Sequence, residues 1–110
     1  MKQKRLTFGQ VIARERKNRN LNQKELAMRV LKEDGIAISP TYLNDIEHNR
    51  RNPPSPFLIE QFAKALKLRP EVLYYYAGEL PKGLSNLELD NEQIIAAYAA
   101  FKEMIDSAAA

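Results

Sequence analysis

The sequence predicts an all-α fold of five short helices, followed by a strap and one longer amphipathic helix. Two observations lead to this prediction. Apolar residues recur three and four positions apart, which is the spacing of one helix face. Ser followed by Pro occurs at 39–40 and at 55–56; Ser caps helices and proline is tolerated at the first helical position. A chain of 110 residues can form one small domain with a modest core and an extension.

The first helix begins after Thr7, a residue type that caps helices. One of its faces is apolar and the remainder is strongly basic because of Arg14, Arg16, Lys17 and Arg19. Lys2, Lys4 and Arg5 form a basic arm ahead of it. The second helix begins after Asn22, and Leu26, Ala27 and Val30 give it one buried side. Gly35 interrupts this pattern, and Ile36 and Ile38 are expected to anchor the loop that follows.

The third helix begins at about Pro40, where Leu43 and Ile46 are three apart and can face the core. This leaves polar residues on the open side, and a basic loop follows that ends in Pro53 and Pro54, which cannot continue a helix. A short polar face beside arginines is what reading of the DNA major groove requires, because short side chains reach base edges and guanidinium groups bind phosphate. The same residues also fit a solvated helix followed by a basic loop.

The fourth helix begins at Pro56 and presents an apolar face made of Phe57, Leu58, Phe62, Ala63 and Leu66. The fifth begins at Pro70, with Val72, Leu73 and Tyr76 expected to point inward, and ends near Gly78. Tyr74, Tyr75 and Tyr76 are consecutive and cannot all be buried on one helix, so at least one is expected at the surface.

Residues 79–110 form a strap and a sixth helix in this interpretation. Leucines anchor the strap, and Asp90 with Gln93 resembles a capping box at the start of the helix. The helix carries an apolar stripe with helical spacing that requires a partner. The partner is either the five-helix domain of the same chain or the same helix in a second subunit; a helix that follows an already complete domain favours the second subunit. The stripe consists of Ile94, Ala97, Tyr98, Phe101, Met104 and Ile105.

The charge distribution indicates a polyanionic partner. Residues 1–51 carry twelve Lys or Arg and six Asp or Glu, whereas residues 52–110 carry five and eight. This asymmetry favours binding of the basic half to a polyanion.

The sequence has no Cys and a single histidine, His48, so we expect no metal site. The motifs of an enzyme are not present in the sequence. No segment has the length or apolar character of a membrane span, and a cytoplasmic protein is expected.

The run from Leu21 to Pro54 resembles the helix-turn-helix of Cro/C1-type regulators, also called the XRE family. The resemblance implies a five-helix, lambda-repressor-like DNA-binding domain over residues 1–78 and a strap with a dimerisation helix over residues 79–110. It implies reversible binding of double-stranded DNA without chemistry or cofactor. The matching positions are Leu21, Asn22, Gln23, Leu26, Ala27, Ser39, Tyr42, Ile46, Glu47, Arg50, Arg51 and Pro53.

The resemblance also implies roles for particular residues. Arg16 and Glu47 would form a partly buried bidentate pair that fixes the third helix. Asn44 would read adenine, Thr41 a thymine methyl group, and Asp45 would either accept from cytosine or orient an arginine. The base-reading residues are Pro40, Thr41, Asn44 and Asp45. The phosphate-binding residues are Asn22, Gln23, Tyr42, His48, Arg50, Arg51 and Asn52.

The sequence departs from the family pattern at two places. Residues 28–38 lie between the Leu-Ala pair and the capping Ser, about twice the usual number, so either the second helix is longer or the turn is an excursion. Asn49 stands where family members commonly have Gly, and Asn is the next most tolerant residue of a left-handed cap.

A dimer with two such helices predicts an inverted-repeat DNA site with half-sites about 34 Å apart, or a multiple of that distance. The expected dimerisation residues are Tyr75, Ile94, Tyr98, Phe101 and Ile105. The function predicted from the sequence is therefore a DNA-binding regulator, most simply a repressor, that acts as a homodimer. The alternative is an antitoxin-type or sporulation-type regulator whose C-terminal helix binds a protein partner.

Overall fold

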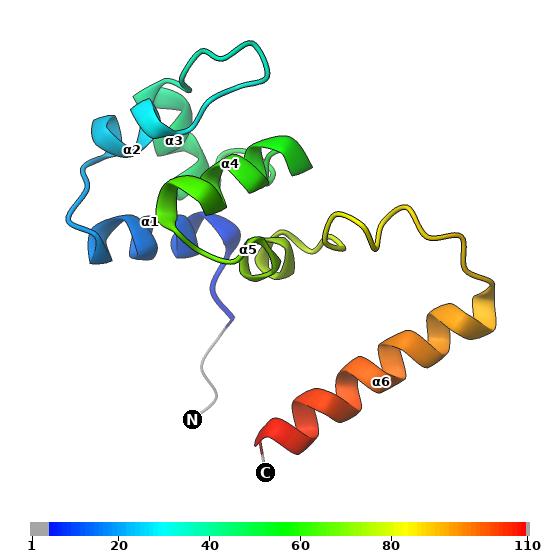
Figure 1. The fold of residues 1–110 in the computed structure, drawn as a ribbon. Coiled ribbons are helices and arrows are strands. Elements are labelled where there is room, and N and C mark those ends of the chain that lie inside the picture. The colour runs from blue at the N-terminus through cyan, green and yellow to red at the C-terminus, as the bar shows by residue number, and fades with distance from the viewer. Residues whose placement is uncertain (1–4, 110) are drawn as a thin grey trace.

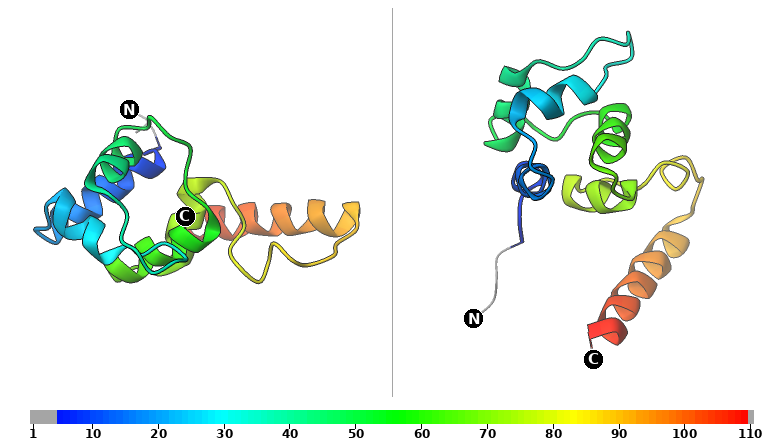
Figure 2. Two further views of the ribbon diagram at one scale, coloured as in Figure 1. Left: turned by 90° about the horizontal axis from the view of Figure 1, so that it is seen from above. Right: turned by 60° about the vertical axis from the view of Figure 1, so that its left-hand side comes forward.

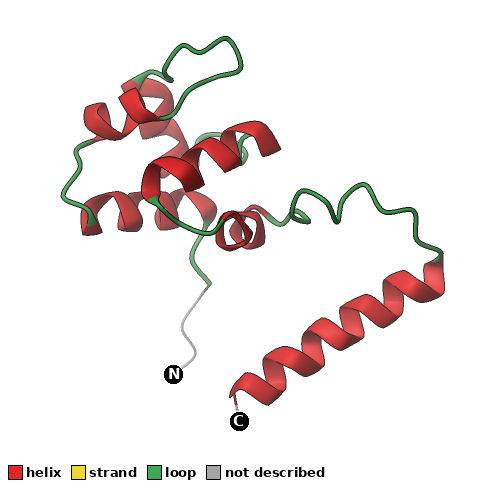
Figure 3. Ribbon diagram, in the orientation of Figure 1, coloured by secondary structure: helices red, strands yellow, loops and turns green. Residues whose placement is uncertain are grey.

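The structure is a computed structural model and describes residues 5–109 (Figure 1). Within this range helices joined by loops form the fold, with one isolated β-bridge between Leu31 and Ala37 (Figure 3). The predicted all-α class is therefore confirmed. The helices are α1 (Phe8–Asn18), α2 (Gln23–Arg29), α3 (Pro40–Glu47), α4 (Pro56–Leu66), α5 (Pro70–Ala77) and α6 (Asn91–Ala109).

The helices begin where the capping residues predict. Thr7, Asn22, Ser39 and Ser55 each accept a hydrogen bond from a backbone N–H in the first turn of the following helix. The cap matters because the first four N–H groups of a helix have no partner within it. Asp90 and Gln93 form the predicted reciprocal pair at the start of α6, with distances of 2.9 and 2.8 Å.

Helices α1 to α5 surround one core, in which α1 packs against α3 and α5, α2 against α3, and α4 against α5. Two expectations about this core are wrong, because Phe57 and Val72 are exposed. On α5 the buried face runs through Leu73 and Tyr74, which places Val72 outside. The fully buried large side chains are Tyr74, Phe62, Ile12, Leu26, Leu43, Ile46, Ile59, Leu66, Leu73, Val11 and Val30.

Tyr74 brings a polar group into this core. Its hydroxyl is buried and has no hydrogen-bond partner among the described residues. Burial, and then the negative charges of Glu60 and Glu79, raise the pKa of Tyr74 to about 12. The deprotonated form is disfavoured because a phenolate would be placed in the core beside carboxylates. Tyr75, by contrast, is exposed, so the prediction that one tyrosine of the run lies at the surface is confirmed.

The segment between α2 and α3 is an excursion, and α2 is not extended. The chain leaves the bundle at Val30, turns at Gly35 and returns at Ile38, as the loop beyond α2 in Figure 1 shows. Ile38 N–H donates to the Val30 carbonyl at 2.9 Å, and both side chains are buried. Gly35 has φ +84°, a left-handed conformation that glycine adopts without steric cost. Ile38 is thus an anchor as expected, whereas Ile36 is exposed.

Helix α6 stands clear of the five-helix bundle (Figure 2). The strap over residues 79–90 connects it to α5, and the leucines predicted as anchors are exposed along it. Every residue of α6 whose burial is described is exposed. The predicted apolar stripe is therefore left uncovered in the single chain.

The basic arm is described only from Arg5, since Lys2 and Lys4 lie outside the described residues. Arg5 folds back onto the end of α5. Its guanidinium group donates to the Tyr75 carbonyl oxygen and lies 4.3 Å from the centre of the Tyr75 ring. Such cation–π contacts are attractive because the face of an aromatic ring is electronegative. Arg5 thus connects the N-terminal segment to α5.

Candidate nucleic-acid interface

The outward face of α3 carries the predicted base-reading residues. Ser39 caps the helix and Pro40 occupies its first turn, while Leu43 and Ile46 are buried below. Pro40 and Thr41 are exposed, and Asn44 and Asp45 are half-buried. These four side chains lie on the side of α3 opposite the core because of the 3.6-residue period. A short helix with its polar face outward has the shape that enters a major groove.

An ion pair fixes the C-terminal end of α3 to α1. Arg16 on α1 donates to both carboxylate oxygens of Glu47, at 2.7 and 2.9 Å, and also to the Leu21 carbonyl at 2.8 Å. The side chains of Arg16 and Glu47 are 11% and 3% exposed. The hydrogen bonds to Glu47 raise the pKa of Arg16 above its ordinary value. The bidentate pair expected from the sequence is therefore present.

Gln23 extends this pair to the base-reading face. Its side-chain nitrogen donates to Glu47 at 3.0 Å and to the Asn44 side-chain oxygen at 3.1 Å. Both amide hydrogens are then in use, so the side chain has no donor left for a phosphate. That Gln23 contacts a phosphate through its backbone amide or its side chain stays a prediction. What it does here is orient Asn44, whose own amide hydrogens remain available to a base.

Close contact between backbones also positions α3. A Cβ atom on Gly9 of α1 would lie 2.1 Å from the Ile46 carbonyl oxygen and 2.8 Å from the side-chain oxygen of Asn49. No side chain fits there, so Gly9 allows α1 to cross the end of α3. Asn49 has φ +59°, the left-handed conformation predicted for this position.

Asp45 pairs with the two arginines of the loop that follows α3. Its carboxylate lies 3.4 Å from Arg50 and 3.7 Å from Arg51. Arg51 also stacks over the ring of Tyr42 at 5.2 Å. Of the two roles expected for Asp45, the geometry favours the orientation of arginine. Arg50 and Arg51 remain more than half exposed, so their outer nitrogens are accessible to a ligand.

Two shallow grooves flank the exposed face of α3. The α1-side groove lies between α1 and the end of α3 and is lined by residues that include Gln10, Arg14, Lys17, Gln23 and His48. The loop-side groove is lined by Tyr42, Asn49, Arg50, Arg51, Asn52, Pro53 and Pro54. Helical geometry places them on opposite flanks, because Glu47 and Tyr42 stand on opposite edges of the face centred on Asn44 and Asp45. Of the predicted phosphate-binding residues, Gln23 and His48 line the first groove and Tyr42, Arg50, Arg51 and Asn52 line the second.

Asn22 and His48 are both held by local hydrogen bonds. The Asn22 side-chain oxygen accepts from the N–H of Glu25 at 2.7 Å, so this residue caps α2. His48 Nδ1 lies 2.8 Å from the Asn44 carbonyl oxygen. A carbonyl accepts hydrogen bonds, so Nδ1 carries a hydrogen. In the neutral ring Nε2 then has none and cannot donate to a phosphate.

Gln10, Arg14 and Lys17 are not among the site residues predicted from the sequence. Arg14 and Lys17 are predicted only as part of the basic surface of the first helix, and Gln10 is not singled out. Their spacing is the available signal, because positions 10, 14 and 17 follow the i, i+4, i+7 pattern of one helix face. The second signal is Gly9, a residue of low helix propensity inside a predicted helix.

Comparisons with known proteins agree with this geometry. A family model described as a helix-turn-helix domain matches residues 9–81. A solved structure of a SinR protein and SinI protein complex contains a similar chain, with 23% identity and a TM-score of 0.52 over 92% of this chain and 93% of that one. At this identity the likeness concerns the fold. The comparison with curated proteins gives no match.

Within residues 5–109 no helix is long and apolar enough to cross a membrane.

The family match extends from α1 to the residues just beyond α5. It agrees with the resemblance to Cro/C1-type regulators seen in the sequence. Since the matched residues make up well over half of the chain, this protein belongs to the helix-turn-helix domain family and is a DNA-binding transcriptional regulator.

Proposed function

We propose that this protein binds an inverted-repeat DNA site as a homodimer and represses transcription. The observation that carries the proposal is the arrangement of α3 between the two polar grooves. A helix about 10 to 12 Å wide fills a major groove that is about 12 Å wide. The phosphate backbones of the two strands must then pass on either side of α3, where the grooves lie.

Within this proposal, Asn44 makes the most discriminating base contact. Gln23 holds its side-chain oxygen, which retains a second lone pair, and leaves its amide hydrogens available. An asparagine offering one acceptor and one donor matches the edge of adenine. Thr41 is exposed one turn earlier on the same face and can contact a thymine methyl group. Arg50, Arg51 and Asn52 serve the backbone on the loop side.

The dimer is proposed to form through α6. Its exposed apolar residues Ile94, Tyr98, Phe101 and Ile105 are spaced by four, three and four positions. This is the spacing of the apolar seam of a coiled coil, in which the helix of a second subunit covers the stripe. The charged residues Lys102 and Asp106 lie on one flank of this stripe, where they form an exposed ion pair. Tyr75 is exposed at the end of α5 and is proposed to extend the contact.

The experiment for DNA recognition is selection from a random duplex pool, performed at moderate and at higher salt. We expect an inverted repeat that persists at the higher salt, since base contacts do not depend on counterion release as phosphate contacts do. The spacer gives the distance between the two α3 helices. Failure to enrich any sequence above background would contradict sequence-specific binding.

The experiment for the dimer compares two substitutions on α6. Phe101→Asp places a charge within the seam, whereas Ile95→Asp is a matched control about 100° away around the helix. Light scattering after size-exclusion chromatography should show a dimer for the wild type and for Ile95→Asp, and a monomer for Phe101→Asp. Both residues are exposed in the single chain, so neither change affects the core. Equal masses for all three proteins would contradict this seam.

The second candidate function is regulation through a protein partner bound to α6. It is favoured by the exposed stripe and by the similar solved structure, which is a complex between two proteins, SinR and SinI. In this case the isolated chain would be monomeric with α6 uncovered, and the wild type would have the mass expected for Phe101→Asp.

Both candidate functions require contact with chromosomal or phage DNA. The proposed location is therefore the bacterial cytoplasm, and the proposed origin is a chromosomal or a phage gene.

A further inference from the structure

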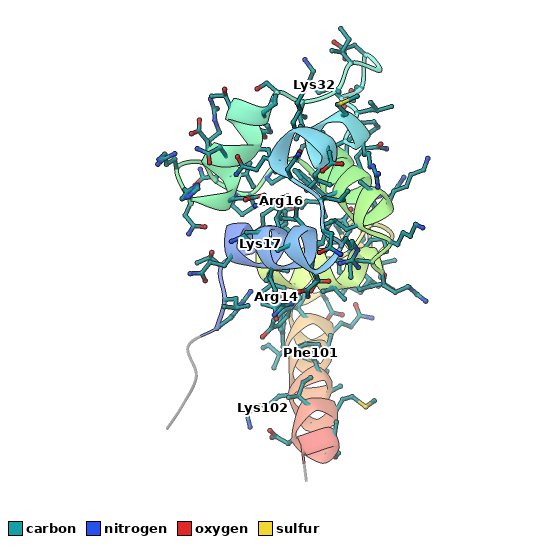
Figure 4. All side chains as sticks on the ribbon, turned by 90° about the vertical axis from the view of Figure 1, so that its left-hand side faces the viewer. Arg14, Arg16, Lys17, Lys32, Phe101 and Lys102 are labelled. Atoms are coloured by element: carbon teal, nitrogen blue, oxygen red, sulfur yellow. The ribbon has the colours of Figure 1, made fainter. Side chains whose placement is uncertain are left out.

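The α1-side groove carries cations that the recognition of DNA by α3 and its loop does not use. It is lined on one side by Gln10, Arg14 and Lys17, which share a face of α1, and on the other by His48 at the end of α3. Figure 4 looks onto this part of the molecule and labels both cations together with Arg16. Arg16 belongs to the buried pair with Glu47, so the charge of the groove depends on Arg14 and Lys17.

These side chains have donors that remain available. Lys17 is exposed and makes no ion pair within residues 5–109. Arg14 uses its Nε for Glu15, at 3.1 Å, and keeps its two terminal nitrogens. Gln10 accepts from the Thr7 N–H through its side-chain oxygen, which leaves its amide nitrogen as a donor. A groove with two cations and a free amide therefore faces solvent beside α3.

Gln23 and His48, the predicted phosphate-binding residues that line this groove, do not by themselves make it a phosphate site. The donors of Gln23 are both used within the protein, and His48 in its neutral form offers no hydrogen at Nε2. The residues predicted from the family pattern on this flank therefore lack a permanent cation. The loop-side groove differs, because Arg50 and Arg51 line it directly. If one DNA strand passes each flank of α3, the strand on the α1 side needs its cation from α1.

We propose that the α1-side groove binds one backbone phosphate of the DNA strand opposite the one held by Arg50 and Arg51, with Lys17 as its cation. This inference rests on the proposed function and adds α1 to the DNA-binding surface. Arg14 stands one turn before Lys17, lines the same groove and keeps its two terminal nitrogens available, so it assists. Ala13 directly precedes Arg14 and also lines the groove, where its small side chain leaves room for the phosphate.

The test measures the salt dependence of DNA affinity for the full-length chain with Lys17→Ala and Lys64→Ala. Lys64 is the matched control, because both lysines are exposed in the last turn of an 11-residue helix and only Lys17 lines the groove. Each lost phosphate contact reduces the slope of log K against log salt by about 0.9. The ratio of the variant's affinity to that of the wild type should therefore be about eight-fold lower at 0.1 M salt than at 1 M salt. We expect this change for Lys17→Ala, retention of the wild-type slope by Lys17→Arg, and no change for Lys64→Ala.

Ethylation interference supplies a second readout that locates the phosphate. In the wild type, ethylation of one phosphate on the α1-side strand should weaken binding, and the effect should vanish in Lys17→Ala. Arg50→Ala removes a cation of the loop-side groove and should also have a smaller slope. Equal slopes for Lys17→Ala, Lys64→Ala and the wild type, together with a smaller slope for Arg50→Ala, would overturn the inference and leave the proposed function standing. Absence of any selected DNA sequence for the wild type would overturn both.

Discussion

Substitution of Arg16 should show how strongly the fold depends on the pair that fixes α3. Arg16→Ala leaves the Glu47 carboxylate, whose side chain is 3% exposed, with Gln23 as its remaining side-chain donor. Removing one partner of a buried ion pair costs about 3–5 kcal/mol because the other charge stays buried without compensation. A small domain has about 5–15 kcal/mol of stability in total. Arg16→Ala should therefore lose a large fraction of the free energy of unfolding.

The assay is urea denaturation of the two single variants and the double variant. Glu47→Ala should cost a similar amount, because it leaves the Arg16 guanidinium group with the Leu21 carbonyl as its hydrogen-bond acceptor. The double variant should be more stable than the sum of the two single effects predicts, since no unpaired charge remains in it. Arg69→Ala at the exposed Arg69–Glu71 pair is the control and should leave the midpoint unchanged. Single effects below about 1 kcal/mol that add without coupling would show that the Arg16–Glu47 pair does not stabilise the fold.

Three other substitutions test separate features. Gly9→Ala should destabilise the domain by about 3 kcal/mol in urea and weaken DNA binding, because its Cβ would overlap the Ile46 carbonyl. Tyr74→Phe should keep full stability at neutral pH, since the hydroxyl has no partner. In the wild type the pKa of Tyr74 is 10.0 in the unfolded chain and about 12 in the folded protein. The free energy of unfolding should therefore fall by about 2.7 kcal/mol as pH rises from the first value to the second. Tyr74→Phe should not show this fall. Lys67→Gly should raise the melting temperature, with about 0.5–1 kcal/mol of stabilisation, because Lys67 has φ +55°.

Local signals located the helices well because each start depends on residues adjacent in sequence. A cap such as Ser39 and a proline such as Pro40 act within one turn, so α3 begins where these two residues predict. Which neighbour of Leu73 is buried on α5 was less predictable. Val72 and Tyr74 are alternatives, because each can share an inward face with Leu73. The choice between them depends on how α5 packs against α1 and α4.

The site was predictable where it follows a family pattern and unpredictable where it depends on tertiary contacts. The positions of Arg16 and Glu47 follow from that pattern, although they are 31 residues apart. Gln23 matches the pattern equally well, yet its donors turn inward, toward Asn44 and Glu47. Lys17 lacks a motif of its own and becomes relevant only because α1 lies beside the end of α3. The excursion over residues 31–37 closes through backbone hydrogen bonds from Lys32 to Ile36 and from Ile38 to Val30, which the helical spacing of apolar residues does not predict.

Base reading by α3 is tested most directly by the sequence specificity of Asn44→Ala on the site obtained by selection. Affinity should be measured for the wild type and the variant against duplexes with each base pair of one half-site replaced in turn. The variant should bind the selected site about 1–3 kcal/mol more weakly and lose discrimination at a single base pair, an A·T pair in the selected site. A variant that discriminates at every position as well as the wild type does would contradict base reading by α3.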